Sequence, residues 1–120
     1  KKVNDSYGHP QGDAVLCKIS HILRNNIRVC DTLGRYGGEE FSIILPESKL
    51  EDSVNLAERI RKEVEQYNFG EENKVIRCTV SIGVSSYPGP GIKSLEDLIS
   101  RADKSLYNAK AEGRNRVCII

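Results

Sequence analysis

Two adjacent carboxylates follow a pair of glycines in the segment Gly37-Gly38-Glu39-Glu40-Phe41. Paired glycines allow the positive φ angles of a tight hairpin turn and let a bulky ligand approach the main chain. Neighbouring carboxylates repel each other unless a cation or solvent screens their charge. The pentapeptide alone therefore fits both an exposed acidic hairpin and a cation-binding turn.

Further polar side chains stand near the two ends of the chain. Asn4 and Asp13 offer an amide and a carboxylate, which can form several hydrogen bonds. On its own, Asp13 better fits a carboxylate at the N-terminus of a helix, where the dipole favours negative charge. Lys110 and Arg114, near the end of a predicted helix, would on their own interact with the helix dipole or solvent.

An arginine and an aspartate, Arg28 and Asp31, precede the glycine pair by a few residues. A guanidinium is a fixed set of donors that can pair with an anion or an acceptor edge, and a carboxylate is an acceptor. A surface salt bridge between the two side chains is the ordinary alternative, and such pairs contribute little to stability. The RxxD pattern by itself does not decide between these interpretations.

The composition limits the classes of protein to which the chain can belong. Its 120 residues, 38% hydrophobic and 29% charged, fit one small domain. A formal net charge of +1 argues against a dedicated nucleic-acid or membrane-binding patch, which needs a clear basic excess. The four cysteines form no CxxC pair, so a zinc site has poor support. Cys17, Cys78 and Cys118 have apolar-rich surroundings and are predicted to be buried thiols.

The hydrophobic pattern predicts the helices that would position these residues. Apolar residues recur at helical spacing in segments 15–27, 50–64 and 95–109. Ser94 is the predicted N-cap of the third helix, and Gly113 is predicted to end it.

A polar loop is predicted over residues 4–13, ahead of the first helix. Strands are predicted at residues 32–36, 41–45, 76–84 and 117–120. The resulting order, α-β-β-α-β-α-β, describes an α/β layer in which a sheet is backed by helices.

Several motifs, in order along nearly the whole chain, resemble the GGDEF domain, the catalytic module of diguanylate cyclases, here in its GGEEF form. The motifs are Asn4-Asp5-x-Tyr7-Gly8-His9-x-x-Gly12-Asp13, Arg35-Tyr36-Gly37-Gly38-Glu39-Glu40-Phe41, Leu56-Ala57-Glu58-Arg59-Ile60-Arg61, Thr79-Val80-Ser81-Ile82-Gly83-Val84 and Ala102-Asp103-x-x-Leu106-Tyr107-x-Ala109-Lys110-x-x-Gly113-Arg114-Asn115. Separate motifs in this order are difficult to reconcile with chance similarity.

The resemblance implies a ferredoxin-like sheet of the nucleotide-cyclase palm type, backed by helices. It also implies a first strand, ending in a metal-binding aspartate, ahead of Lys1. Residues 1–120 are therefore expected to be an N-terminally truncated part of the domain, and by themselves a weak catalyst or none. The implied reaction joins two GTP molecules into cyclic di-GMP: a ribose 3′-hydroxyl attacks an α-phosphorus and pyrophosphate leaves, with Mg²⁺ or Mn²⁺ as the metal.

The resemblance also assigns roles to individual residues. Glu39 matches the metal-binding and catalytic carboxylate. Glu40 is a second candidate metal ligand, although successive side chains on a strand point to opposite faces. Lys1 matches a lysine that helps stabilise the transition state. The remaining matches are the guanine readers Asn4 and Asp13 and the triphosphate contacts Lys110 and Arg114.

At its offset from the glycine pair, the Arg28 and Asp31 pattern matches the family's inhibitory site, where cyclic di-GMP binds. Arg59 matches a secondary arginine that reaches the same ligand from a neighbouring domain. Catalysis in the family needs two GTP-loaded domains facing each other, so a homodimer is implied. The domain is expected in the cytoplasm, with room for an upstream sensor or membrane region.

Two other interpretations stay open. A GGDEF domain that has lost its activity can serve as a cyclic di-GMP receptor, although the intact signature and the presence of Asn4 and Asp13 oppose degeneration. A ferredoxin-like RNA-binding module would need stacking aromatics on its central strands, and segment 75–85 has none. No nucleic-acid partner is therefore expected.

Overall fold

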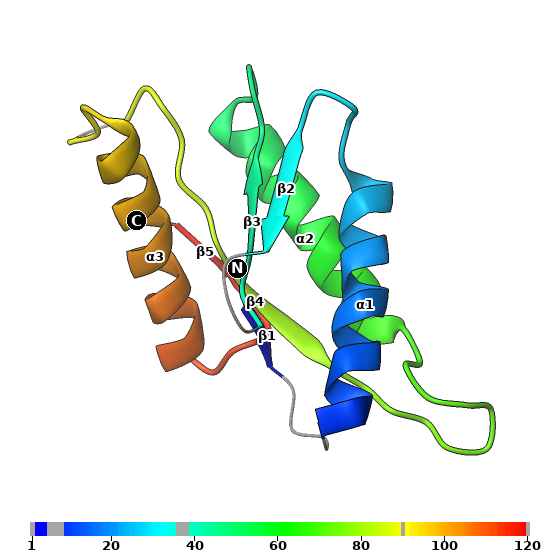
Figure 1. The fold of residues 1–120 in the computed structure, drawn as a ribbon. Coiled ribbons are helices and arrows are strands. Elements are labelled where there is room, and N and C mark those ends of the chain that lie inside the picture. The colour runs from blue at the N-terminus through cyan, green and yellow to red at the C-terminus, as the bar shows by residue number, and fades with distance from the viewer. Residues whose placement is uncertain (1, 5–8, 36–38, 90, 120) are drawn as a thin grey trace.

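The computed structural model describes residues 2–4, 9–35, 39–89 and 91–119, with the backbone alone described for 2–4 and 9–13. The elements in chain order are β1 (Lys2–Asn4), α1 (His9–Asn26), β2 (Thr32–Arg35), β3 (Phe41–Ile44), α2 (Leu50–Gln66), β4 (Thr79–Gly83), α3 (Leu95–Ala111) and β5 (Val117–Cys118). Figure 1 shows α3 on one side of the strands and α1 on the other.

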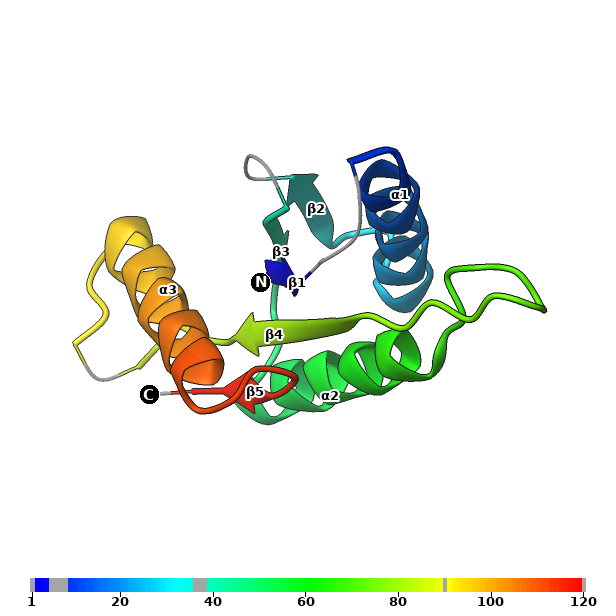
Figure 2. The same ribbon diagram turned by 90° about the horizontal axis from the view of Figure 1, so that it is seen from below.

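Strand β4 is the centre of a three-stranded sheet with the order β1-β4-β5. β1 pairs with β4 antiparallel, with Val3 opposite Val80. β5 pairs with β4 parallel, with Ile82 opposite Val117. β2 and β3 form a separate antiparallel hairpin, which confirms the predicted pairing of these strands across the glycine pair. Seen from below, β4 runs between α2 and the layer that holds α1 and the hairpin (Figure 2).

Helices α2 and α3 form where the sequence predicts them. In α2 one face is buried, and its members recur at the spacing of an amphipathic helix: Ser53, Ala57, Ile60 and Val64. Helix α3 begins after Ser94, whose Oγ accepts a hydrogen bond of 3.1 Å from the amide of Asp97. This confirms the predicted N-cap, a contact that stabilises a helix by roughly 1 kcal/mol.

The core lies between α1, α2 and β4. Its fully buried aliphatic side chains come from all three elements: Ile19, Leu23, Ile60, Val64 and Val80. Each contributes roughly 1.5–3 kcal/mol through burial. Gly83, at the end of β4, allows α3 to approach closely, because a β carbon there would collide with the backbone of α3 at Ala102 and Leu106.

The beginning of the chain differs from the sequence prediction in two respects. The structure adds a strand, β1, ahead of the predicted order, and α1 begins at His9 rather than after a loop that reaches Asp13. Pro10 is compatible with this early start. The first amides of a helix have no intrahelical acceptor, so a proline, which has no amide hydrogen, loses no hydrogen bond there. The mixed helix-and-sheet class itself is confirmed.

The third predicted strand is shorter than expected. It was predicted over residues 76–84, and β4 covers Thr79–Gly83. The reason is that the backbone of Ile76 bonds to the preceding loop: its amide donates to Asn68 Oδ1 at 3.1 Å and its carbonyl accepts from the amide of Phe69 at 2.9 Å.

The predicted burial of three cysteines is correct in part. Cys78 is buried and Cys118 is half-buried, but Cys17 is exposed. The prediction for Cys17 is wrong. Val15 and Ile19 lie on the buried face of α1, and Cys17, two positions from each, lies on the exposed face of the helix.

Candidate functional site

The β2–β3 hairpin carries the signature carboxylates. Arg35, at the end of β2, lies opposite Phe41, at the start of β3. Phe41 is 4% exposed and belongs to the core, so it fixes the strand directly after Glu39 and Glu40. Both glutamates are half-buried. The glycines of the signature, residues 37–38, lie outside the described part of the chain.

A cleft of about 360 Å³ lies between α1 and this hairpin. Apolar groups such as Leu16 and Phe41 line it together with Arg24 and Arg35, and the exposed Cys17 lies on its α1 side. An apolar wall with a few polar groups is typical of sites for small molecules. Sequence reasoning missed the lining residues on α1, because Leu16 was interpreted only as part of the apolar helix face.

The predicted guanine readers are described only by their backbone positions. Asn4 lies in β1, opposite Thr79 of β4. Asp13 is the fifth residue of α1, which has no acidic residue in its first turn. The interpretation of Asp13 as a carboxylate at the helix N-terminus is therefore wrong, because the helix begins four residues earlier. Lys1, the predicted transition-state lysine, lies outside the described residues.

The predicted phosphate contacts lie where α3 ends. The amide of Gly113 donates to the Lys110 carbonyl at 3.4 Å, and the amide of Arg114 donates to the Ala109 carbonyl at 2.9 Å. These two bonds make a Schellman motif, with Gly113 at a φ of 123°. Gly113 thus ends the helix as predicted. Lys110 is half-buried in the last helical turn, and Arg114 is exposed just beyond it.

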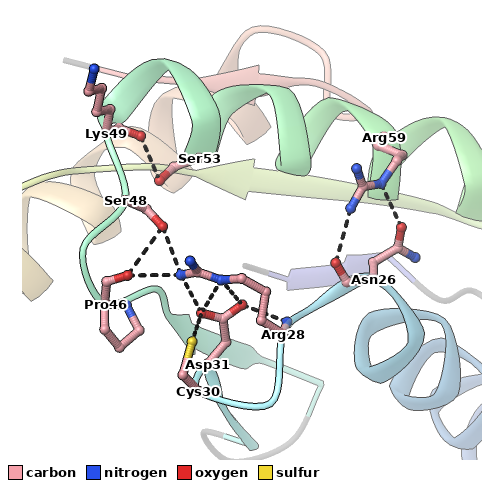
Figure 3. Close-up of polar contacts among 9 residues, drawn as sticks. All are labelled: Asn26, Arg28, Cys30, Asp31, Pro46, Ser48, Lys49, Ser53 and Arg59. Atoms are coloured by element: carbon pink, nitrogen blue, oxygen red, sulfur yellow. Dashed lines mark hydrogen bonds and ion pairs between the residues drawn. The ribbon is translucent and has the colours of Figure 1, made fainter.

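Arg28 and Asp31 face each other in the turn between α1 and β2 (Figure 3). Arg28 Nη2 donates to Asp31 Oδ1 at 2.8 Å, and the Arg28 backbone amide donates to Asp31 Oδ2 at 2.7 Å. The Asp31 side chain is 1% exposed, whereas that of Arg28 is 53% exposed. The carboxylate is therefore covered, and the guanidinium remains open to a ligand.

The pairing sets the charge of both groups. The hydrogen bond from Arg28 is the main cause that holds the pKa of Asp31 below its usual value. The same bond raises the pKa of Arg28. Both side chains are consequently charged throughout the physiological range of pH.

The loop after β3 also holds Arg28, which sequence reasoning missed. Arg28 Nη2 donates to the Pro46 carbonyl at 2.8 Å and to Ser48 Oγ at 3.0 Å, as drawn in Figure 3. A backbone carbonyl leaves no signal in a sequence, and a serine in a turn is too common to be singled out. The guanidinium is thus fixed by partners from two loops that are distant in sequence.

Arg59 reaches the same segment from α2. Its Nε donates to Asn26 Oδ1 at 2.8 Å, and its Nη2 donates to the Asn26 carbonyl at 3.0 Å. Asn26 is the last residue of α1 and stands two positions before Arg28. The structure therefore brings Arg59 to the end of the helix that leads into the Arg28 turn (Figure 3).

The candidate residues divide between two ends of the molecule. In Figure 1 the beginning of α1 and the end of α3 lie toward the lower end, and β2 ends near mid-height. The turn between α1 and β2 and the beginning of α2 lie toward the upper end. The turn after α3 and the Arg28 and Asp31 turn thus lie toward opposite ends in Figure 1, and the β2–β3 hairpin lies across β4 from the turn after α3 in Figure 2.

The donor set of the hairpin suits a hard divalent cation. Glu39 and Glu40 offer carboxylate oxygens, the ligands that Mg²⁺ prefers in proteins. Among the residues that the structure describes, no three histidine, cysteine, aspartate or glutamate side chains gather as a metal cluster. Within the same residues, no helix is both long enough and apolar enough to cross a membrane.

Comparison with known proteins identifies relatives across nearly the whole chain. The family model described as "Diguanylate cyclase, GGDEF domain" matches residues 1–116. Diguanylate cyclase A of Treponema denticola is 44% identical over 119 residues, which make up 99% of this chain and 32% of that protein. The chain thus spans about a third of the length of this relative.

Solved structures share the fold. The active GGEEF domain of a diguanylate cyclase from Vibrio cholerae matches with a TM-score of 0.80 and 32% identity, covering 98% of this chain and 78% of that one. The GGDEF domain of DgcB from Caulobacter crescentus, in complex with c-di-GMP, matches with a TM-score of 0.83 and 31% identity, covering 98% of this chain and 72% of that one.

Proposed function

Because this chain belongs to the family of diguanylate cyclase GGDEF domains, we propose that it joins two molecules of GTP into cyclic di-GMP with release of two pyrophosphates. The observation that supports this most is the signature hairpin, with Phe41 buried behind Glu39 and Glu40.

The chemistry is a phosphoryl transfer that depends on positioning and on neutralising charge. The 3′-oxygen of one GTP bonds to the α-phosphorus of the other, the bond to the β-phosphate oxygen breaks, and the hydroxyl proton passes to a base. In this proposal Asn4 and Asp13 orient the guanine. Lys110 and Arg114 neutralise the triphosphate, with Lys1 stabilising the transition state.

Glu39 is the proposed catalytic carboxylate and metal ligand, and Glu40 is the second candidate ligand. A bound Mg²⁺ or Mn²⁺ would offset the negative charge of the phosphates and polarise the reacting phosphorus. Glu39 is half-buried and stands two residues before Phe41, whose burial fixes the backbone of the strand that follows. The reaction needs two nucleotides, so we propose a transient homodimer in which each copy presents one.

The turn at the upper end is the proposed site of product inhibition. The exposed side of Arg28 can bind a phosphate or a guanine edge of cyclic di-GMP, because Asp31, Pro46 and Ser48 already fix its orientation. Asp31 belongs to the site by holding the arginine from its covered position. Arg59 of a neighbouring domain is the proposed secondary arginine that reaches the same ligand.

The test is the formation of cyclic di-GMP by the purified full-length protein with GTP and Mg²⁺. We expect product from the wild-type protein and from Glu96→Gln, a control on the exposed first turn of α3, and about a thousandfold less from Glu39→Gln. Binding of cyclic di-GMP without any product from GTP would instead favour an inactive receptor domain.

A further inference from the structure

We propose that Arg61, Glu65 and Asn115 form a clasp that sets the position of Arg114, so that Arg61 and Asn115 are positioning residues for the substrate triphosphate. The inference rests on the proposed role of Arg114 in binding phosphate. It adds residues of α2 that have no assigned role in the reaction and that lie far from Arg114 in sequence.

The backbone around Arg114 has an unusual conformation. Gly113, Arg114 and Asn115 have φ angles of 123°, 64° and 47° in succession. Only glycine adopts positive φ without cost, and each other residue costs of the order of 1 kcal/mol or more unless its surroundings hold it. Two non-glycine residues in this region therefore need an external support.

The side chain of Asn115 receives that support from α2. Its Oδ1 accepts a hydrogen bond of 3.0 Å from Arg61 Nη1, and its Nδ2 donates to Glu65 Oε2. The backbone amide of Asn115 donates to Ser81 Oγ at 3.2 Å, and Ser81 is 1% exposed within β4. The side-chain amide of Asn115 is thus bonded to α2 through its oxygen and its nitrogen, and its backbone amide is bonded to β4.

Arg61 is itself held firmly. Its Nε and Nη2 donate to the two carboxylate oxygens of Glu58 at 3.1 and 3.2 Å, and its Nη1 lies 3.6 Å from Glu65 Oε1. The Arg61 side chain is only 15% exposed. A bidentate guanidinium with this little exposure is an oriented donor rather than a solvated surface charge.

The guanidinium of Arg114 is in the opposite situation. It is exposed, and among the described residues its side chain has no hydrogen-bond or ion-pair partner. Its backbone is fixed on both sides, because its amide bonds to the Ala109 carbonyl and its carbonyl accepts from Arg116 Nε at 3.1 Å. In the clasp, Arg61 therefore fixes the turn that contains Asn115, and the guanidinium of Arg114 stays accessible to an anion.

The test measures binding of a nonhydrolysable GTP analogue with Mg²⁺ to the full chain by calorimetry. Asn115→Gly keeps the positive φ without strain and removes both side-chain bonds. Arg61→Ala removes the same support from α2, and Lys62→Ala, the exposed neighbouring cation, is the matched control. We expect Asn115→Gly and Arg61→Ala to weaken binding about tenfold and Lys62→Ala to leave it unchanged.

Combination with Arg114→Ala separates positioning from general damage. If the clasp acts through Arg114, the Asn115→Gly, Arg114→Ala double variant binds no more weakly than Arg114→Ala alone. Binding of guanosine, which carries no phosphate, should stay within about twofold of the wild type in every variant.

Two results would overturn the inference in different ways. Full additivity in the double variant, or unchanged binding in Asn115→Gly while Arg114→Ala binds weakly, would show that Arg114 does not need the clasp. Normal binding in Arg114→Ala would remove the proposed phosphate role of Arg114, and the clasp would lose its purpose with it.

Discussion

Two loops of this molecule each present an arginine, and they do so in opposite ways. In the turn between α1 and β2, the guanidinium of Arg28 is fixed by Asp31, Pro46 and Ser48. In the turn after α3, the backbone at Arg114 is fixed while its guanidinium has no partner among the described residues. A fixed guanidinium suits recognition of one rigid ligand, and an open one suits a triphosphate whose charge moves during reaction.

The largest effect is expected from removing the open arginine. Arg114→Ala should lower kcat/KM for GTP about a hundredfold, because a cation that neutralises the triphosphate is lost. Steady-state rates at several GTP concentrations measure this. Arg116→Ala, on the same turn but bonded to a backbone carbonyl and to Glu112, should have a much smaller effect. Equal losses in the two variants would contradict the distinction drawn between them.

Arg28, the fixed arginine, should affect the affinity for cyclic di-GMP and leave the initial rate of turnover unchanged. Arg28→Ala is expected to weaken binding of cyclic di-GMP about tenfold or more, since a charge-assisted hydrogen bond to phosphate disappears. Calorimetric titration with cyclic di-GMP measures the loss. Lys49→Ala, an exposed cation in the neighbouring loop, is the control. Product binding equal to the wild type in Arg28→Ala would remove the inhibitory-site assignment.

A change in the packing of α3 should also affect the turn that contains Arg114 more than the turn that contains Arg28. Gly83→Ala places a β carbon against the backbone of α3 and should lower the free energy of unfolding by about 1–3 kcal/mol. Gly34→Ala is a control, because its β carbon would lie 3.5 Å from Ser42 Oγ, an ordinary contact. Urea unfolding measures both. We expect the folded Gly83→Ala protein to lose affinity for GTP more than for cyclic di-GMP.

The pH dependence of the Arg28 turn has a definite sign. The pKa of Asp31 is lowered in the folded protein, chiefly by its bond to Arg28. The stabilisation from this pair is therefore fully present above the unfolded pKa of about 4 and is lost as pH falls through the lower folded value. The difference in stability between wild type and Asp31→Asn should be constant from pH 5 to 8 and shrink in stronger acid. A difference that changes near neutral pH would contradict this assignment.

The smallest effect concerns the second loop that holds Arg28. Ser48→Ala removes one of several bonds to the guanidinium and should weaken binding of cyclic di-GMP only about two- to threefold. Ser100→Ala, exposed on α3, is the matched control for the same titration. A loss as large as that of Arg28→Ala would mean that Ser48 contacts the ligand itself.

The sequence was sufficient for the helices, the hairpin and the position of the candidate carboxylates, because each has a local signal. Ser94 and Gly113 mark the two ends of α3 as predicted, and Phe41 is buried where the signature ends. The clasp could not be predicted, because Arg61 and Asn115 come from distant segments and only the packing of α2 on β4 brings them together. The same holds for the Pro46 carbonyl, since backbone acceptors have no residue identity.

The errors have a similar origin. The alternative interpretation of Asp13, a carboxylate at a helix terminus, followed from the turn formers before it, yet α1 begins at His9. Cys17 was expected to be buried from its apolar neighbours, yet the helical period turns it outward. In both cases the prediction used the types of the neighbouring residues, whereas the position of the residue along the helix determines its place.

The most direct test of the whole account is a progress curve of cyclic di-GMP formation from GTP and Mg²⁺ by the full-length protein as wild type, Arg28→Ala and Arg114→Ala. We predict that the wild type starts fast and slows as product accumulates, that Arg28→Ala starts equally fast and continues, and that Arg114→Ala is slow from the first turnover. An Arg28→Ala protein as slow at the start as Arg114→Ala would contradict the separation of catalysis and product control between the two ends of the molecule.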